Sequence, residues 1–119
     1  MERAITFRGM DLSGKWVEGS LVVWPDGGCE IMIPANAANL MDKVAVIAET
    51  VGQFTGETSR DGKRIFEGDI VRYETIDGEM AEFAVVWGSG CWELEDLDGH
   101  HFRIAGFSAI VEVVGNVHE

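Results

Sequence analysis

Hydrophobic and polar residues alternate in short runs along most of this 119-residue chain, and turns rich in glycine and aspartate separate the runs. Alternation with a period of two is the pattern of a half-buried strand, and turn signals about every 8–12 residues are typical of small β-sandwiches and β-barrels. We therefore expect an all-β protein. The predicted strands or extended segments are residues 4–8, 15–24, 29–33, 50–56, 70–74, 81–87, 92–97, 101–104 and 110–117.

These strands fall into two groups along the chain. The first group predicts an N-terminal β-hairpin subdomain over residues 1–50, and the second predicts a C-terminal small β-barrel of the Src-homology type, with five strands, over residues 51–119. Residues 34–42 contain helix formers, but Pro34 and two asparagines weaken a helix, so we expect a loop with no more than one helical turn. An isolated hairpin is marginally stable, so the first subdomain should pack against the barrel or another subunit.

Net charge limits the partners that the chain can bind. The chain has 9 basic and 21 acidic residues and a net charge of −12; residues 1–55 contribute −3 and residues 56–119 contribute −9. Binding to nucleic acid requires a basic footprint, and anionic membranes attract the same charge. We therefore expect no direct binding to nucleic acid and none to a membrane. The acidity either keeps the protein soluble or forms a patch for a basic partner.

Cysteine usage and the first residues indicate a cellular compartment. Cys29 and Cys91 lie far apart without a CxxC motif, and Met1 leads directly into the first predicted strand instead of a secretory leader. We therefore expect a cytoplasmic protein, whose thiols stay reduced.

Five segments, in order along nearly the whole chain, carry a family resemblance: residues 7–9, 14–19, 50–56, 61–71 and 113–119. The strongest is Asp-Gly-Lys-Arg-Ile-Phe-Glu-Gly-Asp-Ile-Val over residues 61–71. Together they resemble the YopX family of phage and prophage proteins. The resemblance implies a β-rich fold with an N-terminal β-subdomain and a barrel-like C-terminal part, a phage or prophage origin and a cytoplasmic setting. It supplies no activity, catalytic residue or cofactor, and we expect no cofactor.

The densest motif is split between two segments. Its members are Gln53, Phe54, Thr55, Gly56, Glu67, Gly68 and Asp69. They could form a polar binding surface. They could equally be structural, because glycine supplies a positive φ and an aspartate side chain can accept hydrogen bonds from the backbone of a turn.

A second group of polar residues follows residue 90. Cys91, Asp98, His100 and His101 form a sparse donor set, whereas zinc needs about four ligands, and adjacent histidines on a strand point to opposite faces. A nucleophilic Cys91 would also need an orienting group and an oxyanion hole. We therefore expect no metal site and no catalytic residue. The neighbouring acidic residues alternate with apolar ones, as on a solvated strand face; they are Glu93, Glu95 and Asp96.

The apolar residues of the N-terminal hairpin fall in consecutive runs, residues 21–24 and 31–33, so both of its faces carry apolar side chains. One small barrel can cover only one face, and exposed apolar patches usually mark an interface. We therefore predict a homo-oligomer. The candidate interface residues are Trp16, Leu21, Val23, Trp24, Ile31 and Ile33.

Three functions remain open from the sequence. The first is a phage-encoded, non-enzymatic module that binds a protein partner not identified by the sequence. The second is an acidic protein that imitates nucleic acid and inhibits a host nucleic-acid-binding protein. The third is a small hydrolase or metal enzyme that uses Cys91 and a histidine.

Overall fold

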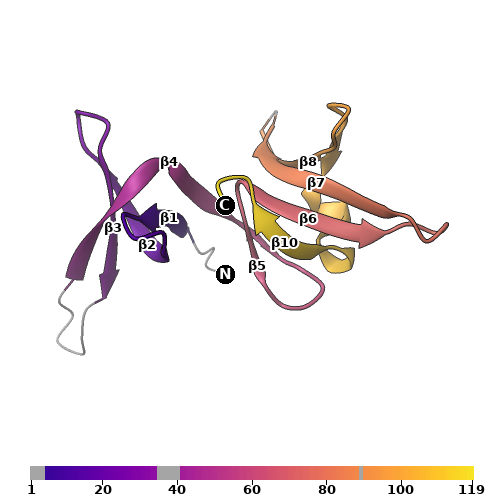
Figure 1. Cartoon of the computed structure of the whole chain (residues 1–119), viewed down its shortest axis with the longest axis horizontal. Coiled ribbons are helices and arrows are strands. Elements are labelled where there is room, and N and C mark those ends of the chain that lie inside the picture. Colours follow the sequence, from indigo (N-terminus) through magenta and orange to yellow (C-terminus); the bar gives the residue numbers. More distant parts are fainter. Residues whose placement is uncertain (1–4, 35–40, 89) are drawn as a thin grey trace. The chain divides into compact units, whose positions relative to one another are not determined.

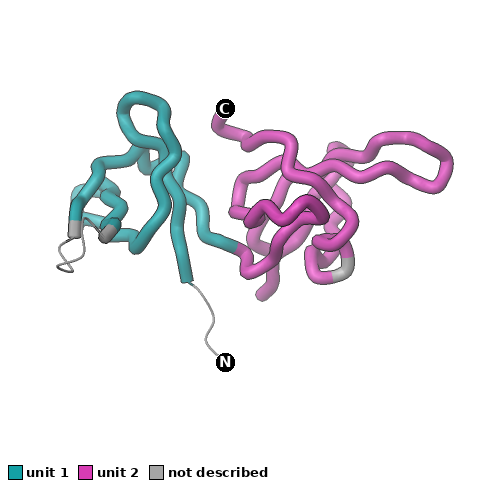
Figure 2. Tube along the Cα trace, turned by 90° about the horizontal axis from the view of Figure 1, so that it is seen from below, with its two compact units in different colours: residues 1–54 teal, residues 55–119 magenta. Residues whose placement is uncertain are grey.

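The computed structural model describes residues 5–34, 41–88 and 90–119. Within these residues the chain consists of antiparallel strands and two short 3-10 helices, which confirms the all-β prediction. The chain divides into two compact units, residues 1–54 and 55–119 (Figure 2). The predicted loop over 34–42 lies mostly outside the described residues, and the division predicted after residue 50 stays a prediction.

In the N-terminal unit, four strands of a five-stranded sheet close on themselves. Its strands are β1 (Phe7–Asp11), β2 (Trp16–Val23), β3 (Cys29–Pro34) and the long β4 (Met41–Thr58), drawn in indigo to magenta in Figure 1. Consecutive strands pair, and β4 pairs with β3 and with β1. The closure point is Val46, which lies opposite both Cys29 and Asp11. The sequence predicted the hairpin, a strand over residues 4–8 and an extended segment over 50–56, but not the full length of β4 (Met41–Thr58), which completes the sheet.

Two glycines make room for the closed sheet. Ile31 is fully buried at 0% exposure, and Val46 is buried at 7%. A Cβ on Gly9 would lie 2.9 Å from a Val46 methyl group, and a Cβ on Gly19 would lie 2.2 Å from the carbonyl oxygen of Met32. Glycine is therefore required at these two positions for close packing, since the neighbouring strands approach where a side chain would start.

The C-terminal unit is a second antiparallel sheet, in the order β10-β6-β7-β8-β9 (Figure 1). These five strands correspond to the five predicted between residues 70 and 117, and their closure into a barrel stays a prediction. The short β5 pairs with β4. The remaining elements are β5 (Arg64–Phe66), β6 (Asp69–Glu74), β7 (Met80–Trp87), β8 (Trp92–Glu95), β9 (His101–Arg103), η1 (Ile104–Gly106), η2 (Ser108–Ile110) and β10 (Glu112–Asn116).

One face of this sheet carries the hydrophobic core. Alternation along the strands directs every second residue to that face, and η1 adds Ile104 to the cluster. Aromatic rings extend the core towards the edge strand β9: Phe102 contacts Phe83 with ring centroids 5.7 Å apart and Phe107 at 5.9 Å. The buried members are Ile65, Val71, Phe83, Val85, Leu94, Ile104 and Val111.

Five hairpin turns share one design. In each turn, a glycine with positive φ donates its N–H to the carbonyl of the first turn residue, over 2.9–3.2 Å. The N–H of that first residue donates in return to the carbonyl of the residue after the glycine. Positive φ suits glycine because it has no Cβ. Where the first residue is polar, its side chain accepts a further backbone N–H, as Asp11 does from Ser13 and Lys15, both at 2.9 Å. The turns are residues 11–14, 24–27, 59–62, 75–78 and 96–99.

Turn aspartates should make stability sensitive to acid. The pKa values of Asp11 and Asp96 are lowered mainly by backbone hydrogen bonds from Lys15 and His100, and that of Asp61 by the Ser59 hydroxyl. A carboxyl group whose pKa is lower in the folded state stabilises the fold at pH values above its unfolded pKa of 3.8. This stabilisation is lost as the pH falls through the lower pKa of the folded state. The urea midpoint should therefore fall below about pH 4, and less steeply when all three aspartates are changed to asparagine.

The close approach at Gly19 gives a second prediction. Gly19→Ala should destabilise the protein by about 1–3 kcal/mol, because the clashing atom belongs to the Met32 backbone and cannot rotate away. The measurement is urea unfolding followed by circular dichroism. Gly115→Ala is the control, because its Cβ would meet Glu119 Oε1 at an ordinary 3.7 Å, and it should cause no loss. Equal stability of both variants would contradict the close approach.

Candidate functional site

The motif Glu67, Gly68 and Asp69 is part of a hydrogen-bond network around the buried Asp69 in the C-terminal unit. Asp69 is 1% exposed and accepts the Phe66 N–H at 2.8 Å and the Asn116 side-chain amide at 3.1 Å. Gly68 has φ of 88°, donates to the Val85 carbonyl and accepts from Val117. We call these contacts the Asp69 network. It ties β6, β7 and the end of β10 together, and this favours the structural interpretation of the motif.

The other half of the motif divides between the two units. Gln53 lies opposite Phe7 in β4, and Phe54 donates its N–H to the Thr6 carbonyl at 2.7 Å. In the C-terminal unit, the Thr55 hydroxyl donates to the Ile65 carbonyl at 2.8 Å, and Gly56 has φ of 87°. Both of these hydrogen bonds are accepted by backbone carbonyl groups, so this half of the motif also stabilises the conformation of the main chain.

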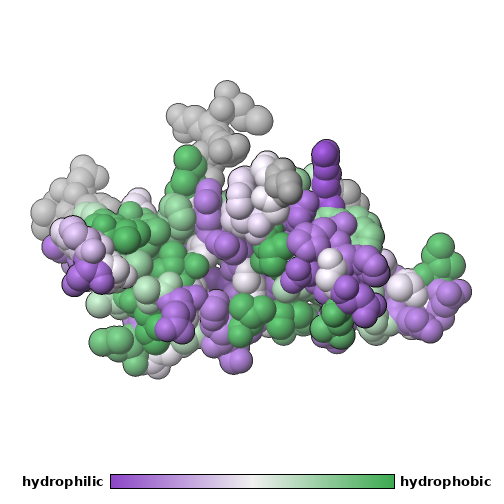
Figure 3. Space-filling model, turned by 90° about the horizontal axis from the view of Figure 1, so that it is seen from above, coloured by the Kyte–Doolittle hydropathy of each residue, from purple (hydrophilic) through white to green (hydrophobic). Residues whose placement is uncertain are grey.

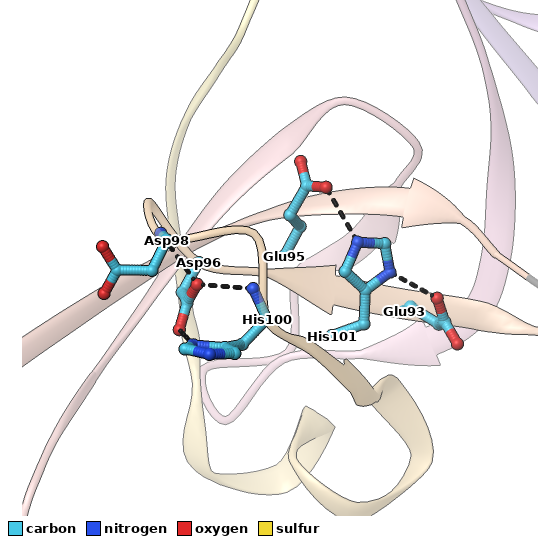
Figure 4. Close-up of polar contacts among 6 residues, drawn as sticks. All are labelled: Glu93, Glu95, Asp96, Asp98, His100 and His101. Carbon is cyan, nitrogen blue, oxygen red and sulfur yellow. Dashed lines mark hydrogen bonds and ion pairs between the residues drawn. The ribbon is translucent and has the colours of Figure 1, made fainter.

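A second polar group lies on the β8–β9 hairpin, where Glu93 and Glu95 of β8 flank His101 of β9 (Figure 4). Glu93 Oε1 lies 2.7 Å from Nδ1 and Glu95 Oε2 lies 2.8 Å from Nε2 of the same imidazole. The hydrogen bond with Glu93, and then that with Glu95, raises the pKa of His101. We call these three residues the His101 clamp. It is the polar cluster with the clearest chemical consequence, because both carboxylates favour the imidazolium form.

The adjacent turn brings Asp96, Asp98 and His100 together, with one ligand atom of each within 4.8 Å of the others. The Asp96 carboxylate already accepts the N–H groups of Asp98 at 2.9 Å and His100 at 2.8 Å, and it contacts His100 Nδ1 at 3.2 Å (Figure 4). All three residues belong to an exposed or half-exposed hairpin turn. The turn design described above accounts for this cluster without an ion.

Cys91 is separated from the imidazole by a carboxylate. Its Sγ donates to Glu93 Oε2 at 3.8 Å, while Glu93 Oε1 contacts His101. The second imidazole nitrogen is held by Glu95. A cysteine nucleophile needs the imidazole within hydrogen-bonding distance of its thiol. Here both imidazole nitrogens instead contact carboxylates.

Sequence reasoning assigned Glu93 and Glu95 to a solvated face and missed their partner. The sequence does contain a signal for this contact: two acidic residues two positions apart on one predicted strand, and a histidine on the next predicted strand. Which histidine faces them depends on the register between β8 and β9, in which Glu95 lies opposite His101. That register cannot be read from the alternation of either strand alone.

The closed sheet divides the candidate interface residues into two sets. Leu21 lies opposite the buried Ile31, and a Cβ on Gly19 would meet methyl groups of both Ile31 and Ile33, so these three share the inner face. Ile31 is therefore a core residue, and its prediction as an exposed interface residue is wrong. The physical reason is that β1 and β4 cover this face of the hairpin.

The other three candidates remain accessible to different extents. Trp16 is half-buried, with the Arg8 guanidinium 4.2 Å from its ring centroid. Val23 is 61% exposed and Trp24 45%, and the Trp24 indole donates to Glu30 at 2.6 Å. Hydrophobic side chains also reach the surface between hydrophilic ones on the face seen in Figure 3. Val23 and Trp24 are thus the best placed of the six to meet a partner.

A shallow groove opens beside β6 and η2 in the C-terminal unit. Its apolar walls are Tyr73, Ile76 and Ile110. Two of its polar groups are already used within the fold: Arg60 pairs with Glu112, and the Thr75 hydroxyl accepts the Glu79 N–H at 3.1 Å. The groove therefore presents mainly an apolar wall and no convergent catalytic set among its lining residues.

These features define an all-β protein of two antiparallel sheets in which polar clusters brace hairpins and turns. The chain belongs to the YopX protein family, whose model matches residues 7–119. The resemblance inferred from the sequence is thereby confirmed.

One solved structure similar to the chain is the crystal structure of protein EF1440 from Enterococcus faecalis. The two share 18% sequence identity with a TM-score of 0.58, over 99% of this chain and 96% of that one. At this identity the likeness shows the fold alone. The search of curated proteins found no match. Among the described residues, no helix has the length and apolar character needed to cross a membrane.

The Asp69 network generates a prediction about stability. Asp69→Ala should cost about 1–3 kcal/mol, because it leaves the buried Phe66 N–H and the Asn116 amide without this acceptor. Gly68→Val should cost more than about 1 kcal/mol, because a β-branched residue is strained at φ of 88°. Both are measured by urea unfolding.

Asp77→Ala is the matched control for Asp69→Ala, because Asp77 lies exposed in the β6–β7 turn. It should change stability by less than about 0.5 kcal/mol. Unchanged stability of the Asp69 and Gly68 variants would contradict the structural role and return the motif to consideration as a binding surface.

Proposed function

We propose that this chain is a non-enzymatic protein-interaction module of phage or prophage origin that acts in the cytoplasm of the bacterial host and binds a second copy of itself. Family membership supports the origin, since the resemblance noted in the sequence is to phage and prophage proteins. The observation that carries the binding role is the exposure of Val23 and Trp24 beside the closure point of the N-terminal sheet.

Four apolar residues lie around this part of the sheet. Val23 lies opposite Cys29, which lies opposite the closure residue Val46. Asp11 lies opposite Val46 on its other side, and laterally paired residues are about 5 Å apart, so these four residues form a continuous row. Leu12, Trp24 and Ile47 each directly follow a residue of this row in the chain. The apolar rim, as we call the exposed set, consists of Leu12, Val23, Trp24 and Ile47, with exposures of 82%, 61%, 45% and 39%.

A second copy is the partner that charge favours at this rim. Residues 1–55 contribute only −3 of the net charge of −12, so two N-terminal units repel each other less than two C-terminal units would. Covering exposed apolar area is favourable, and closed symmetric pairs are the commonest way in which one chain covers its own patch.

The two alternative functions have weaker support. An imitation of nucleic acid needs an unbroken array of negative charge, yet Arg72 lies opposite both Glu82 and Glu112 in the sheet register. Arg60 also pairs with Glu112, and His101 lies between two carboxylates. A Cys/His hydrolase is disfavoured by Glu93, which lies between the thiol and the imidazole.

The test is the solution mass by light scattering at micromolar concentration. The wild-type chain should elute at a multiple of 13.0 kDa. Trp24→Glu should shift it towards the single-chain mass, because a carboxylate in an apolar contact must be desolvated.

Ile76→Glu is the control, since Ile76 is fully exposed in the C-terminal unit and should leave the mass unchanged. Circular dichroism confirms that each variant is folded. A wild-type protein at 13.0 kDa would overturn self-association, and an oligomer that survives Trp24→Glu would remove the apolar rim as its interface.

A further inference from the structure

We propose that the His101 clamp is a proton-operated latch on the edge hairpin β8–β9, which is closed while the imidazole carries two protons and opens when one proton leaves. The inference is independent of self-association through the N-terminal unit, because every residue that it uses lies in the C-terminal sheet.

The geometry requires the doubly protonated ring. Nδ1 lies 2.7 Å from Glu93 Oε1 and Nε2 lies 2.8 Å from Glu95 Oε2 (Figure 4). An ionised carboxylate can only accept hydrogen bonds, and a neutral imidazole has one N–H to donate. Only the imidazolium can satisfy both contacts, so loss of a proton turns one of them into an encounter between a lone pair and a carboxylate.

The other groups facing the clamp do not replace this charge. Glu93 also accepts the Cys91 thiol at 3.8 Å, and its carboxylate lies where a Cβ on Gly88 would be. Arg103 lies opposite Glu93 on β9. On the other side of β8, strand β7 places Val86 opposite Glu93 and Ala84 opposite Glu95. Once His101 is neutral, two carboxylates therefore face a single arginine.

The strand that the clamp holds has few other attachments. Strand β9 has three residues, all exposed, and it ends the sheet order, paired with β8. On the opposite face, Phe102 contacts the rings of Phe83 and Phe107 and is itself 39% exposed. Short edge segments with few buried contacts open locally at low free-energy cost. Opening here would uncover both rings and free the edge of β8, which is the type of edge that pairs with other chains.

The direction of the pH response follows from the contacts. The two carboxylates raise the pKa of folded His101 above the ordinary 6.5, the Glu93 contact having the larger effect. A group with a raised folded pKa adds its stabilisation in full below the unfolded value and loses it as the pH rises through the folded value. The latch is therefore closed in mild acid and opens as the pH rises through the raised pKa of folded His101.

The test is amide hydrogen exchange of the full chain from pH 5.5 to 8.5, corrected for the intrinsic pH dependence of exchange, with His101 followed by NMR. The protection of β8 and β9 should fall at the His101 midpoint, by about tenfold for each unit that separates the closed and open pKa values. Protection of β6 and β7 should stay constant.

Three variants isolate the clamp. His101→Gln should abolish the pH-dependent fall, and Glu93→Gln should lower the His101 midpoint because the carboxylate partner is lost. His100→Gln is the matched control, since His100 is in the same hairpin but bonds to Asp96, and it should keep the wild-type response. Constant protection of β8 and β9 through the His101 titration, or a wild-type midpoint at or below 6.5, would overturn the latch. Both of these outcomes are measured on the wild-type protein, so the test does not depend on whether the variants fold.

Discussion

The need of each strand edge for a backbone partner is the constraint on which the N-terminal unit depends. A strand edge left in water can pair with another chain. Strand β4 meets this need on both sides, because it pairs with β3 and with β1. The closed sheet then leaves so little interior that glycine is required where Gly9 and Gly19 face Val46 and Met32. Packing inside the unit follows from that closure.

Polar side chains in the C-terminal unit serve the same purpose by other means. Asp69 is a buried carboxylate that accepts hydrogen bonds from segments before and after it in the chain. Asp96 braces its own turn, and Glu93 and Glu95 hold the edge strand through His101. Carboxylates are acceptors only, so each stabilises a place where donors converge. These four acidic side chains are thus tied to the geometry of strands and turns.

The proposed apolar rim and the proposed latch on the hairpin β8–β9 differ in their chemistry. Apart from the Trp24 indole N–H, which donates to Glu30, the side chains of the apolar rim carry no polar atoms and gain only from being covered. The hairpin β8–β9 differs, since the proposed latch holds it through an imidazolium whose two N–H groups each donate to one carboxylate. In the proposed function, a partner for the apolar rim is selected by shape and hydrophobicity, whereas in the proposed latch solution pH governs access to the edge of β8.

The sequence by itself determined the all-β class, the family and the strands β6 to β10, because alternation and Asp-Gly turns act over a few residues. It also identified Gly68 and Asp69 as possible turn residues. Only the tertiary structure decided that β4 closes a sheet, that Ile31 is core, and that Glu93 and Glu95 hold His101. The Asp69–Asn116 contact spans 47 positions. Such pairs depend on the register between strands and on the entropy of closing long loops, neither of which local alternation specifies.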